Sequence, residues 1–252
     1  MSAARSAPRL TGILAVGFDL GETLYHYGEG PMSWLELSRP ALEHVTDVLG
    51  LDRDRADVEA ACTLVADLDD SRGGLEEVNL QDAMGKILRA LGADASLQVE
   101  RAVDAFFDKA RDSLAAYPDA AATLAALKER GYKVGALTNV PYGMPRRTIQ
   151  QDLERVGLAQ YLDALVTSAD VGVRKPAPEP YQWLAAGLDV ELAEMAYVGN
   201  SDTDVEGAVC AGVVAVLVDR VREPSDYGQA ATVASLSELL DLFGPAATLA
   251  PE

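Results

Sequence analysis

The sequence is poor in the side chains that build disulfide frameworks and transition-metal sites. Its 252 residues include only two cysteines and two histidines. Cys62 and Cys210 lie far apart and in no Cys-x-x-Cys or Cys/His spacing, so we expect both to be reduced packing residues. His26 and His44 are too few for a histidine-based metal centre. A disulfide scaffold and a zinc site are therefore excluded as the basis of the fold.

Positive charge is also scarce, and long apolar runs are missing. Lysine and arginine number 21 against 40 aspartates and glutamates, a net charge of −19 that repels nucleic-acid phosphates and anionic membrane surfaces. No apolar run is long enough to span a bilayer, and residues 1–12 lack the apolar core of a secretory signal. We therefore expect a cytoplasmic protein that binds neither nucleic acid nor membrane.

Short apolar segments recur along the chain and alternate with helical patterns. Each is short, shows no alternation of polar and apolar residues and is bounded by turn residues, as is typical of a strand buried on both faces of a sheet. These segments are 13–18, 133–137, 164–167, 195–198 and 213–218. Their alternation with helices predicts an α/β fold with a doubly wound parallel sheet.

The long stretch between the first two apolar segments carries no strand signal. Apolar positions at helical spacing predict four helices there, separated by turn-rich sequences. The helices are expected at 34–49, 55–68, 80–91 and 97–114. We interpret the stretch as a helical bundle inserted after the first strand, with 69–79 as its most mobile loop. Residues 235–243 indicate a last surface helix.

Polar residues follow the apolar segments at the points where the strands would end. In an open parallel sheet, ligands bind outside these carboxyl ends. The residues there are Asp19, Thr138, Asn139, Lys175 and the acidic cluster at 199–204. Such a set suits phosphoryl transfer, because a carboxylate can attack phosphorus while a hydroxyl and an ammonium hold the phosphate oxygens. Mg²⁺ would help the anionic nucleophile approach an anionic substrate.

Four motifs in order resemble those of the haloacid dehalogenase superfamily. They are DLGET (19–23), ALTN (136–139), RKPAPEPY (174–181) and VGNSDTDVEGAVCAG (198–212). The usual forms are DxDxT, a strand-end Thr or Ser, a Lys often followed by Pro, and an acidic loop containing GD. The resemblance covers nearly the whole chain. It implies a Rossmann-like core at 11–27 and 116–244, a C1-type helical cap at 28–115, and flexible tails at 1–10 and 245–252.

The resemblance also implies roles for individual residues. Asp19 takes the position of the nucleophile, Thr138 that of the phosphate-binding hydroxyl, and Lys175 that of the charge stabiliser. Asp204 takes the position of the second acid in the last motif, and Asn139 joins the catalytic and substrate-binding set. The substrate implied is a small phosphorylated metabolite, which the cap would select.

The implied cofactor is Mg²⁺, with one departure among its ligands. The family's ligand positions hold Asp19, the backbone carbonyl of Gly21 and the side chain of Asn200, with Asp204 as a possible further ligand. Asn200 stands where the family usually has an aspartate, and its amide oxygen brings no negative charge. We therefore expect weak Mg²⁺ binding unless Asp204 or Asp202 compensates. Asp202 also suits the N-cap of the helix that follows.

A second departure concerns the proton donor. Phosphatases of this superfamily usually have an aspartate at the position of Gly21, where it serves as general acid and base, help worth roughly 10² to 10⁴ in rate. Glu22 is a candidate replacement, but in continued strand geometry it would point to the opposite face, so only a turn could bring it in. The alternative interpretation is that Glu22 is a solvated turn residue. His26, near Asp19 in sequence, is a candidate substrate contact, as are Tyr25 and Tyr27.

Three functions remain open from the sequence. The first is a Mg²⁺-dependent phosphatase that works through an aspartyl-phosphate on Asp19. The second is a metal-independent 2-haloacid dehalogenase, whose relatives also lack the second aspartate of the first motif. Those relatives usually carry an aromatic residue at the position of Gly21 and a halide-binding arginine, neither of which is matched here. The third is a ligand- or partner-binding protein with little or no turnover.

Overall fold

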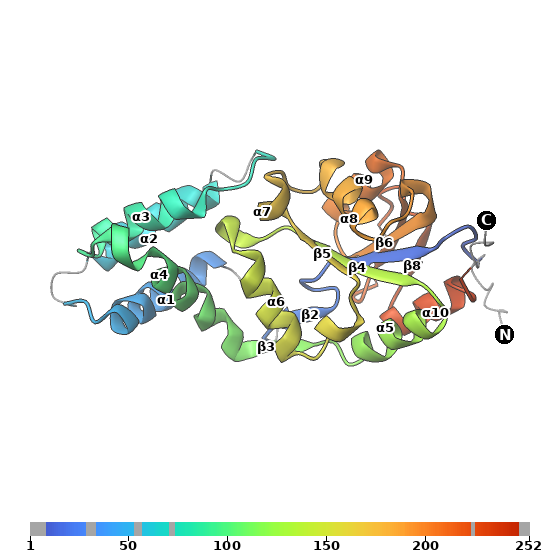
Figure 1. The fold of residues 1–252 in the computed structure, drawn as a ribbon, viewed down its shortest axis with the longest axis horizontal. Helices are drawn as coiled ribbons and strands as arrows, with labels where there is room; N and C mark the ends of the chain where they lie inside the picture. The colour runs from blue at the N-terminus through green and yellow to red at the C-terminus, as the bar shows by residue number, and fades with distance from the viewer. Residues whose placement is uncertain (1–8, 29–33, 53–56, 71–73, 223–224, 247–252) are drawn as a thin grey trace.

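A parallel sheet flanked by helices forms one end of the molecule, and a group of four helices forms the other (Figure 1). The computed structural model describes residues 9–28, 34–52, 57–70, 74–222 and 225–246. The described parts of both chain ends lie at the sheet end, away from the four helices (Figure 1). Within these described ranges, no helix is long and apolar enough to cross a membrane.

The sheet has six strands, all parallel, in the order β5-β4-β1-β6-β7-β8. The strands are β1 (Ala15–Phe18), β4 (Lys133–Thr138), β5 (Ala164–Thr167), β6 (Met195–Gly199), β7 (Val214–Val218) and β8 (Ala231–Val233). The first five coincide with the five apolar segments, and the doubly wound parallel sheet is confirmed. The sixth, β8, went unpredicted because its three residues carry no apolar run, and only Val233 among them is buried.

Helices cover both faces of the sheet because strand side chains alternate between the faces. Val16 and Phe18 of β1 belong to the apolar cluster that also holds α5 (Ala120–Glu129) and α10 (Leu239–Leu242). Ala15 belongs to the cluster of the opposite face, with α8 (Glu179–Gly187) and α9 (Asp202–Ala211). A Cβ added at Gly17 would lie 2.6 Å from the Leu184 side chain, so this glycine allows α8 to approach the sheet.

The remaining core elements connect the strands. They are α6 (Arg146–Arg155), α7 (Ser168–Val171), α8 (Glu179–Gly187), α9 (Asp202–Ala211) and the short 3-10 helices Pro141–Gly143, Ala159–Tyr161, Leu192–Glu194 and Leu236–Glu238. The surface helix expected at 235–243 is instead the last of these 3-10 turns followed by α10. Leu236, Leu239 and Phe243 are buried there, so the segment closes one face of the core.

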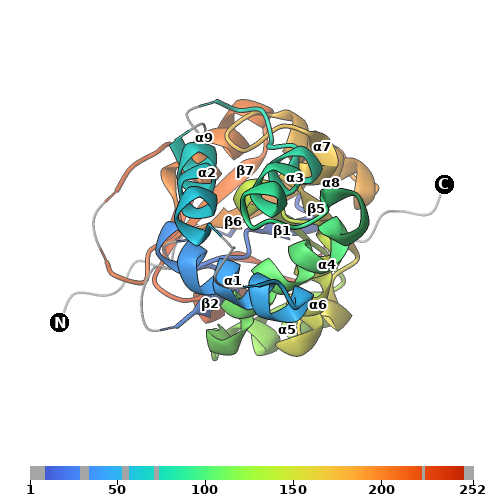
Figure 2. The same ribbon diagram turned by 90° about the vertical axis from the view of Figure 1, so that its left-hand side faces the viewer.

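The four-helix group consists of α1 (Trp34–Leu49), α2 (Val58–Asp70), α3 (Leu80–Ala90) and α4 (Ala95–Asp108). Helix α1 packs on α2 and α4, and α3 packs on the same two helices, as Figure 2 shows end-on. Leu42, Met84 and Phe106 are among the buried residues between them. The predicted start of the second helix, Arg55, lies outside the described residues. The predicted fourth helix ends early, in a 3-10 turn at Lys109–Ser113.

A small antiparallel ribbon joins the four helices to the core. It pairs β2 (Tyr25–Tyr27) with β3 (Leu114–Ala116), so the chain enters and leaves the helical group side by side. The sequence did not predict this ribbon, because three residues are too few to show a periodic pattern.

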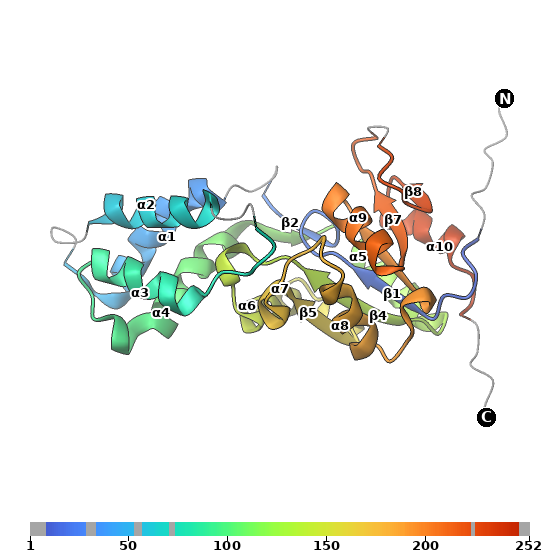
Figure 3. The ribbon, with the colours of Figure 1, turned by 90° about the horizontal axis from the view of Figure 1, so that it is seen from above.

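A second connection is made by the segment before α3, which runs back to the core beside α7 (Figures 1 and 3). Arg174 N donates to Leu75 O (2.8 Å), and Glu77 N donates to Gly172 O (3.0 Å). Glu76 forms an antiparallel bridge with Val173. The described part of the loop expected to be most mobile is therefore paired with core backbone; its residues 71–73 lie outside the described ranges.

Candidate active site

Asp19 lies directly after β1, at the carboxyl edge of the sheet. Its side chain is buried, and its backbone N–H donates to Val198 O of β6 (2.9 Å). The carboxylate lines a pocket of about 250 Å³, the Asp19 pocket. The other lining residues are Gly21, Thr138, Asn139, Lys175, Asn200, Ser201, Thr203 and Asp204. The fold thus brings together the polar residues that follow β1, β4 and β6, together with Lys175 of the third motif.

Lys175 connects the two buried carboxylates of this pocket. Its Nζ lies 2.6 Å from Asp19 Oδ1 and 2.6 Å from Asp204 Oδ1. It also donates to the Tyr197 hydroxyl (3.0 Å), which itself donates to Leu137 O (2.7 Å). With three oxygen acceptors at these distances the ammonium is held in one place, and it fixes the orientation of the Asp19 carboxylate.

Burial and neighbouring charges shift the pKa values of Asp19 and Lys175. Burial raises the pKa of Asp19 to about 6, and the neighbouring Asp204 adds to the rise, although the Lys175 ammonium opposes it. Burial by itself would lower the pKa of Lys175, but the two carboxylates outweigh it and hold that pKa above its usual value. Lys175 is therefore a cation at neutral pH, and Asp19 is mostly ionised there.

Asp204 is held by the loop that starts α9. Its Oδ2 accepts from Asn200 N (3.1 Å), Ser201 N (3.1 Å) and Ser201 Oγ (2.7 Å), while Ser201 Oγ also accepts from Asp204 N (3.2 Å). This is a capping box with Ser201 as N-cap, so the interpretation of Asp202 as N-cap is wrong. Both Asp204 oxygens therefore accept hydrogen bonds, Oδ1 from Lys175 and Oδ2 from the loop.

Thr138, the last residue of β4, and Asn139, which follows it, make different contacts. Thr138 is buried, lines the pocket and donates weakly to Asn139 O (3.4 Å). The Asn139 side chain accepts from Lys175 N (2.8 Å) and donates to Lys175 O (3.0 Å). Asn139 therefore positions the backbone of Lys175, and Thr138 is one of the hydroxyl residues that line the pocket, with Ser201 and Thr203.

Three residues that the sequence predicts as Mg²⁺ ligands, Asp19, Gly21 and Asn200, all line the Asp19 pocket. A carboxylate, a carbonyl and an amide oxygen are donor types that Mg²⁺ accepts, so the chemistry of the set fits the ion. Asn200 Oδ1 also accepts from Thr23 Oγ1 (3.1 Å), which orients the amide. Among the described residues, no group of three or more His, Cys, Asp or Glu side chains is arranged to hold a metal.

Glu22 is not brought to Asp19. Its φ of 59° turns the chain into the left-handed region, and its Oε2 accepts from the Tyr117 hydroxyl (2.8 Å). Glu22 lines a different pocket, which adjoins the first at Asn200. The expected turn is present, but it directs the carboxylate away from the Asp19 pocket.

His26 and the two tyrosines beside it do not line the Asp19 pocket either. His26 Nδ1 contacts Gly28 O (2.6 Å), and its ring lies 4.9 Å from the Tyr117 ring. Tyr25 is buried, and Tyr27 donates to Asp152 of α6 (3.1 Å). These side chains pack the ribbon against the core.

The match to known families agrees with this geometry. A family model described as haloacid dehalogenase-like hydrolase covers residues 13–212, which is most of the chain. The chain belongs to the haloacid dehalogenase-like hydrolases. The four motifs that suggest the superfamily lie within the matched residues, and Asp19, Gly21, Thr138, Asn139, Lys175, Asn200 and Asp204 of these motifs line the Asp19 pocket, whereas Glu22 does not.

Relatives of this haloacid dehalogenase-like hydrolase include both phosphatases and dehalogenases. Glyceraldehyde 3-phosphate phosphatase of Methanopyrus kandleri is 33% identical over 82% of this chain and 84% of its own length. (S)-2-haloacid dehalogenase 1 of a Pseudomonas species is 32% identical over 57% of this chain. The matches to two curated relatives, this dehalogenase among them, span less than two thirds of those proteins. The crystal structure of a HAD phosphatase from Thermococcus onnurineus has 25% identity, a TM-score of 0.63, and coverage of 93% of this chain and 99% of that one.

Sequence reasoning missed two residues that hold the site of this haloacid dehalogenase-like hydrolase. Tyr197 lies inside an apolar strand, so its hydrogen bonds to Lys175 and Leu137 left no local signal. Ser201 could have been found, because Ser-x-x-Asp before a helical pattern is a capping-box signature.

Proposed function

We propose that the chain is a phosphatase that hydrolyses the phosphate ester of a small metabolite through an aspartyl-phosphate on Asp19, with Mg²⁺ as cofactor. The observation that carries the proposal is the buried Asp19 carboxylate, hydrogen-bonded to Lys175 at 2.6 Å and facing a pocket that also holds the Thr138 hydroxyl. A carboxylate held beside a cation and a hydroxyl suits attack on phosphorus. Helices α1–α4, within the cap expected at 28–115, would cover the entrance.

In this mechanism, a carboxylate oxygen of Asp19 forms a bond to phosphorus while the ester oxygen leaves with the bonding electrons. Lys175 and Thr138 hold the non-bridging oxygens, where charge develops in the transition state. Water then attacks phosphorus, the bond to Asp19 breaks, and inorganic phosphate is released. Asp19, the Gly21 carbonyl and Asn200 would hold Mg²⁺, which supplies positive charge to the phosphate oxygens.

The oxygen of the leaving alcohol takes up a proton, and Gly21 has no side chain that could supply it. We therefore infer that turnover is fastest for esters whose alcohol or phenol leaves as an anion, since these need little proton transfer. The experiment that tests the function is a phosphate-release screen with Mg²⁺ on the wild type and Asp19→Asn. Release that disappears in Asp19→Asn supports the proposal, and no release from any ester with the folded wild type rejects it.

A 2-haloacid dehalogenase is the second candidate. The absence of a carboxylate at Gly21 favours it, as does the similarity to the Pseudomonas dehalogenase. Against it, the described residues that line the Asp19 pocket include no arginine to receive a halide. Chloride release from a 2-chloro acid without Mg²⁺, together with no phosphate release, would establish this function in place of the first.

A further inference from the structure

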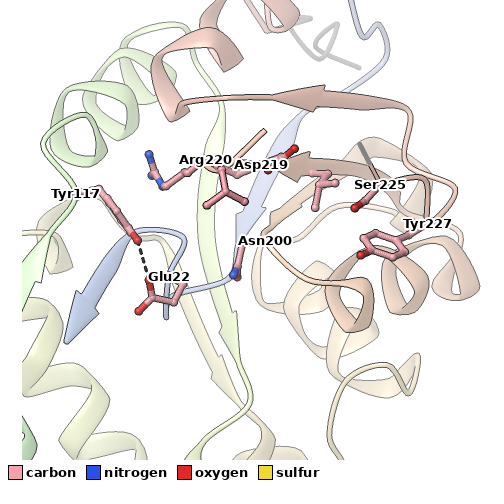
Figure 4. Close-up of a pocket in the computed structure, with 10 residues that line it drawn as sticks. Glu22, Tyr117, Asn200, Asp219, Arg220, Ser225 and Tyr227 are labelled. Atoms are coloured by element: carbon pink, nitrogen blue, oxygen red, sulfur yellow. Dashed lines mark hydrogen bonds between the residues drawn. The ribbon is translucent and has the colours of Figure 1, made fainter. Parts of the chain in front are cut away.

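A second pocket, the Glu22 pocket, adjoins the Asp19 pocket at Asn200. Figure 4 shows the residues that line it. It has a volume of about 340 Å³, and Asn200 lines both pockets. Its walls come from the turn after β1, from Tyr117 after β3, and from the segment that follows β7. No described residue of α1–α4 lines it, so its chemistry is set by the core.

The two pockets are also connected along the chain at Gly21 and Glu22. Gly21 lines the Asp19 pocket, and the next residue lines the Glu22 pocket. A Cβ added at Gly21 would meet no atom within 4 Å, so open space lies beside this residue. The group esterified to a phosphate at Asp19 can therefore extend past Gly21 toward Glu22.

Glu22 is fixed in the pocket as a hydrogen-bond acceptor. Its φ of 59° is uncommon for a residue with a side chain, and its backbone N–H donates to Tyr25 O (2.8 Å). Tyr117 donates to Oε2, and the Arg220 guanidinium carbon lies 3.7 Å from the centre of the Tyr117 ring. Of the described residues, only Tyr117 donates to the carboxylate, so Oε1 is available to a ligand.

Three further polar groups lie around the same space (Figure 4). They are the amide nitrogen of Asn200 and the hydroxyls of Ser225 and Tyr227. Within the described part of the chain, none of the three has a hydrogen-bond partner, because Thr23 uses only the Asn200 oxygen. With Asp219, which also lines it, the pocket thus offers two carboxylates as acceptors, one amide donor and two hydroxyls that donate or accept.

Charge and apolar surface narrow the choice of ligand. Arg220 donates to Thr23 O (3.0 Å) and lies against Tyr117, so its guanidinium is committed to the wall. A carboxylate on the ligand would meet Glu22 and Asp219, and Arg220 is the one cation among the described residues that line the pocket. Leu217 and Val221 provide apolar surface. Several hydroxyls on a carbon skeleton match this combination, because each can donate to Glu22 or accept from the amide.

We propose that the Glu22 pocket binds the leaving group of the substrate and selects uncharged polyhydroxylated groups, such as sugars and polyols, over groups that carry a carboxylate. This inference rests on the proposed phosphatase function. It gives Glu22 a role in substrate binding in place of proton transfer.

The test compares kcat/KM for p-nitrophenyl phosphate, glycerol 3-phosphate, ribose 5-phosphate and 2-phosphoglycolate. For the wild type we expect both polyol esters to exceed 2-phosphoglycolate by about tenfold, the effect of roughly one charge-assisted hydrogen bond. Tyr227→Phe should lower kcat/KM for the polyol esters about fivefold and leave p-nitrophenyl phosphate unchanged. Glu22→Gln should lower kcat/KM for the polyol esters and raise kcat/KM for 2-phosphoglycolate. Tyr161 lines neither pocket, so Tyr161→Phe is the matched control.

The outcomes separate the two proposals. If no ester is hydrolysed, p-nitrophenyl phosphate included, the phosphatase function fails and the inference falls with it. If p-nitrophenyl phosphate is hydrolysed but kcat/KM for 2-phosphoglycolate matches or exceeds that for the polyol esters, the pocket inference is overturned while the function stands. Equal losses for all esters in Tyr227→Phe would overturn it as well. The ranking of the esters by kcat/KM with the wild type tests the pocket inference even if Glu22→Gln does not fold.

Discussion

Arg174 Nη1 lies 2.9 Å from Glu77 Oε2, joining the segment before α3 to the residue that precedes Lys175. Arg174 also donates to Val140 O (2.7 Å), and Ser168 donates to the same glutamate. Both charged side chains are largely buried, at 16% and 4% exposure. The contact therefore ties the four-helix group to the loop that positions the Asp19 pocket.

Glu77→Gln is expected to destabilise the protein and to lower kcat/KM. Removing one charge of a buried pair leaves the other uncompensated, which costs about 3 kcal/mol in the free energy of unfolding. Activity should fall because Arg174 holds the backbone beside Lys175. Urea unfolding and phosphate release measure the two effects. Glu76→Gln is the control, since that neighbouring side chain is exposed; equal effects of the two substitutions would contradict the prediction.

Asp19→Asn should change how stability depends on pH. The pKa of Asp19 is raised from 3.8 to about 6 in the folded protein, chiefly by burial, so the folded state holds this proton more tightly than the unfolded state. Its contribution to stability therefore decreases as the pH rises from about 4 to 6. The difference in unfolding free energy between wild type and Asp19→Asn should move in favour of the variant across that range. Parallel profiles from urea titrations at each pH would refute this expectation.

Gly21→Asp should accelerate phosphate release from esters with poor leaving groups. The open space at Gly21 accommodates a side chain, and a carboxyl group there can protonate the leaving oxygen. General acid catalysis is worth roughly 10² to 10⁴ in rate, and the gain should be larger for alkyl esters than for p-nitrophenyl phosphate. Steady-state kinetics on both ester types check the prediction. An equal gain for both would point to a cause other than proton transfer.

Asn200→Asp should tighten Mg²⁺ binding about tenfold or more, because it adds a second carboxylate to the donors in the Asp19 pocket. A Mg²⁺ titration followed by calorimetry measures this directly and does not depend on turnover. Gln160→Glu adds the same charge at an exposed position and serves as control. Unchanged affinity in Asn200→Asp would show that Asn200 does not contact the ion.

The predicted elements were most accurate where the signal was local and repeated. Residues 164–167 were predicted and found as β5, and 34–49 were predicted and found as α1. The ribbon of β2 and β3 was missed, because strands of three residues have no period and form only when two distant segments meet. The helix expected at 235–243 was assigned to the surface, but it closes the core because Leu236 and Leu239 pack on the sheet side.

The sequence by itself determined the parallel sheet and the set of polar residues at its carboxyl edge, because apolar runs and motif order are properties of neighbouring residues. Only the tertiary structure decided which of those residues touch. Lys175 meets Asp19 across 156 positions, and Glu77 meets Arg174 across 97. The direction of Glu22 was decided in the same way, since a positive φ and a hydrogen bond to Tyr117 carry its carboxylate into a neighbouring pocket. Distance in space between such groups depends on how the strands and loops pack, and no local pattern encodes it.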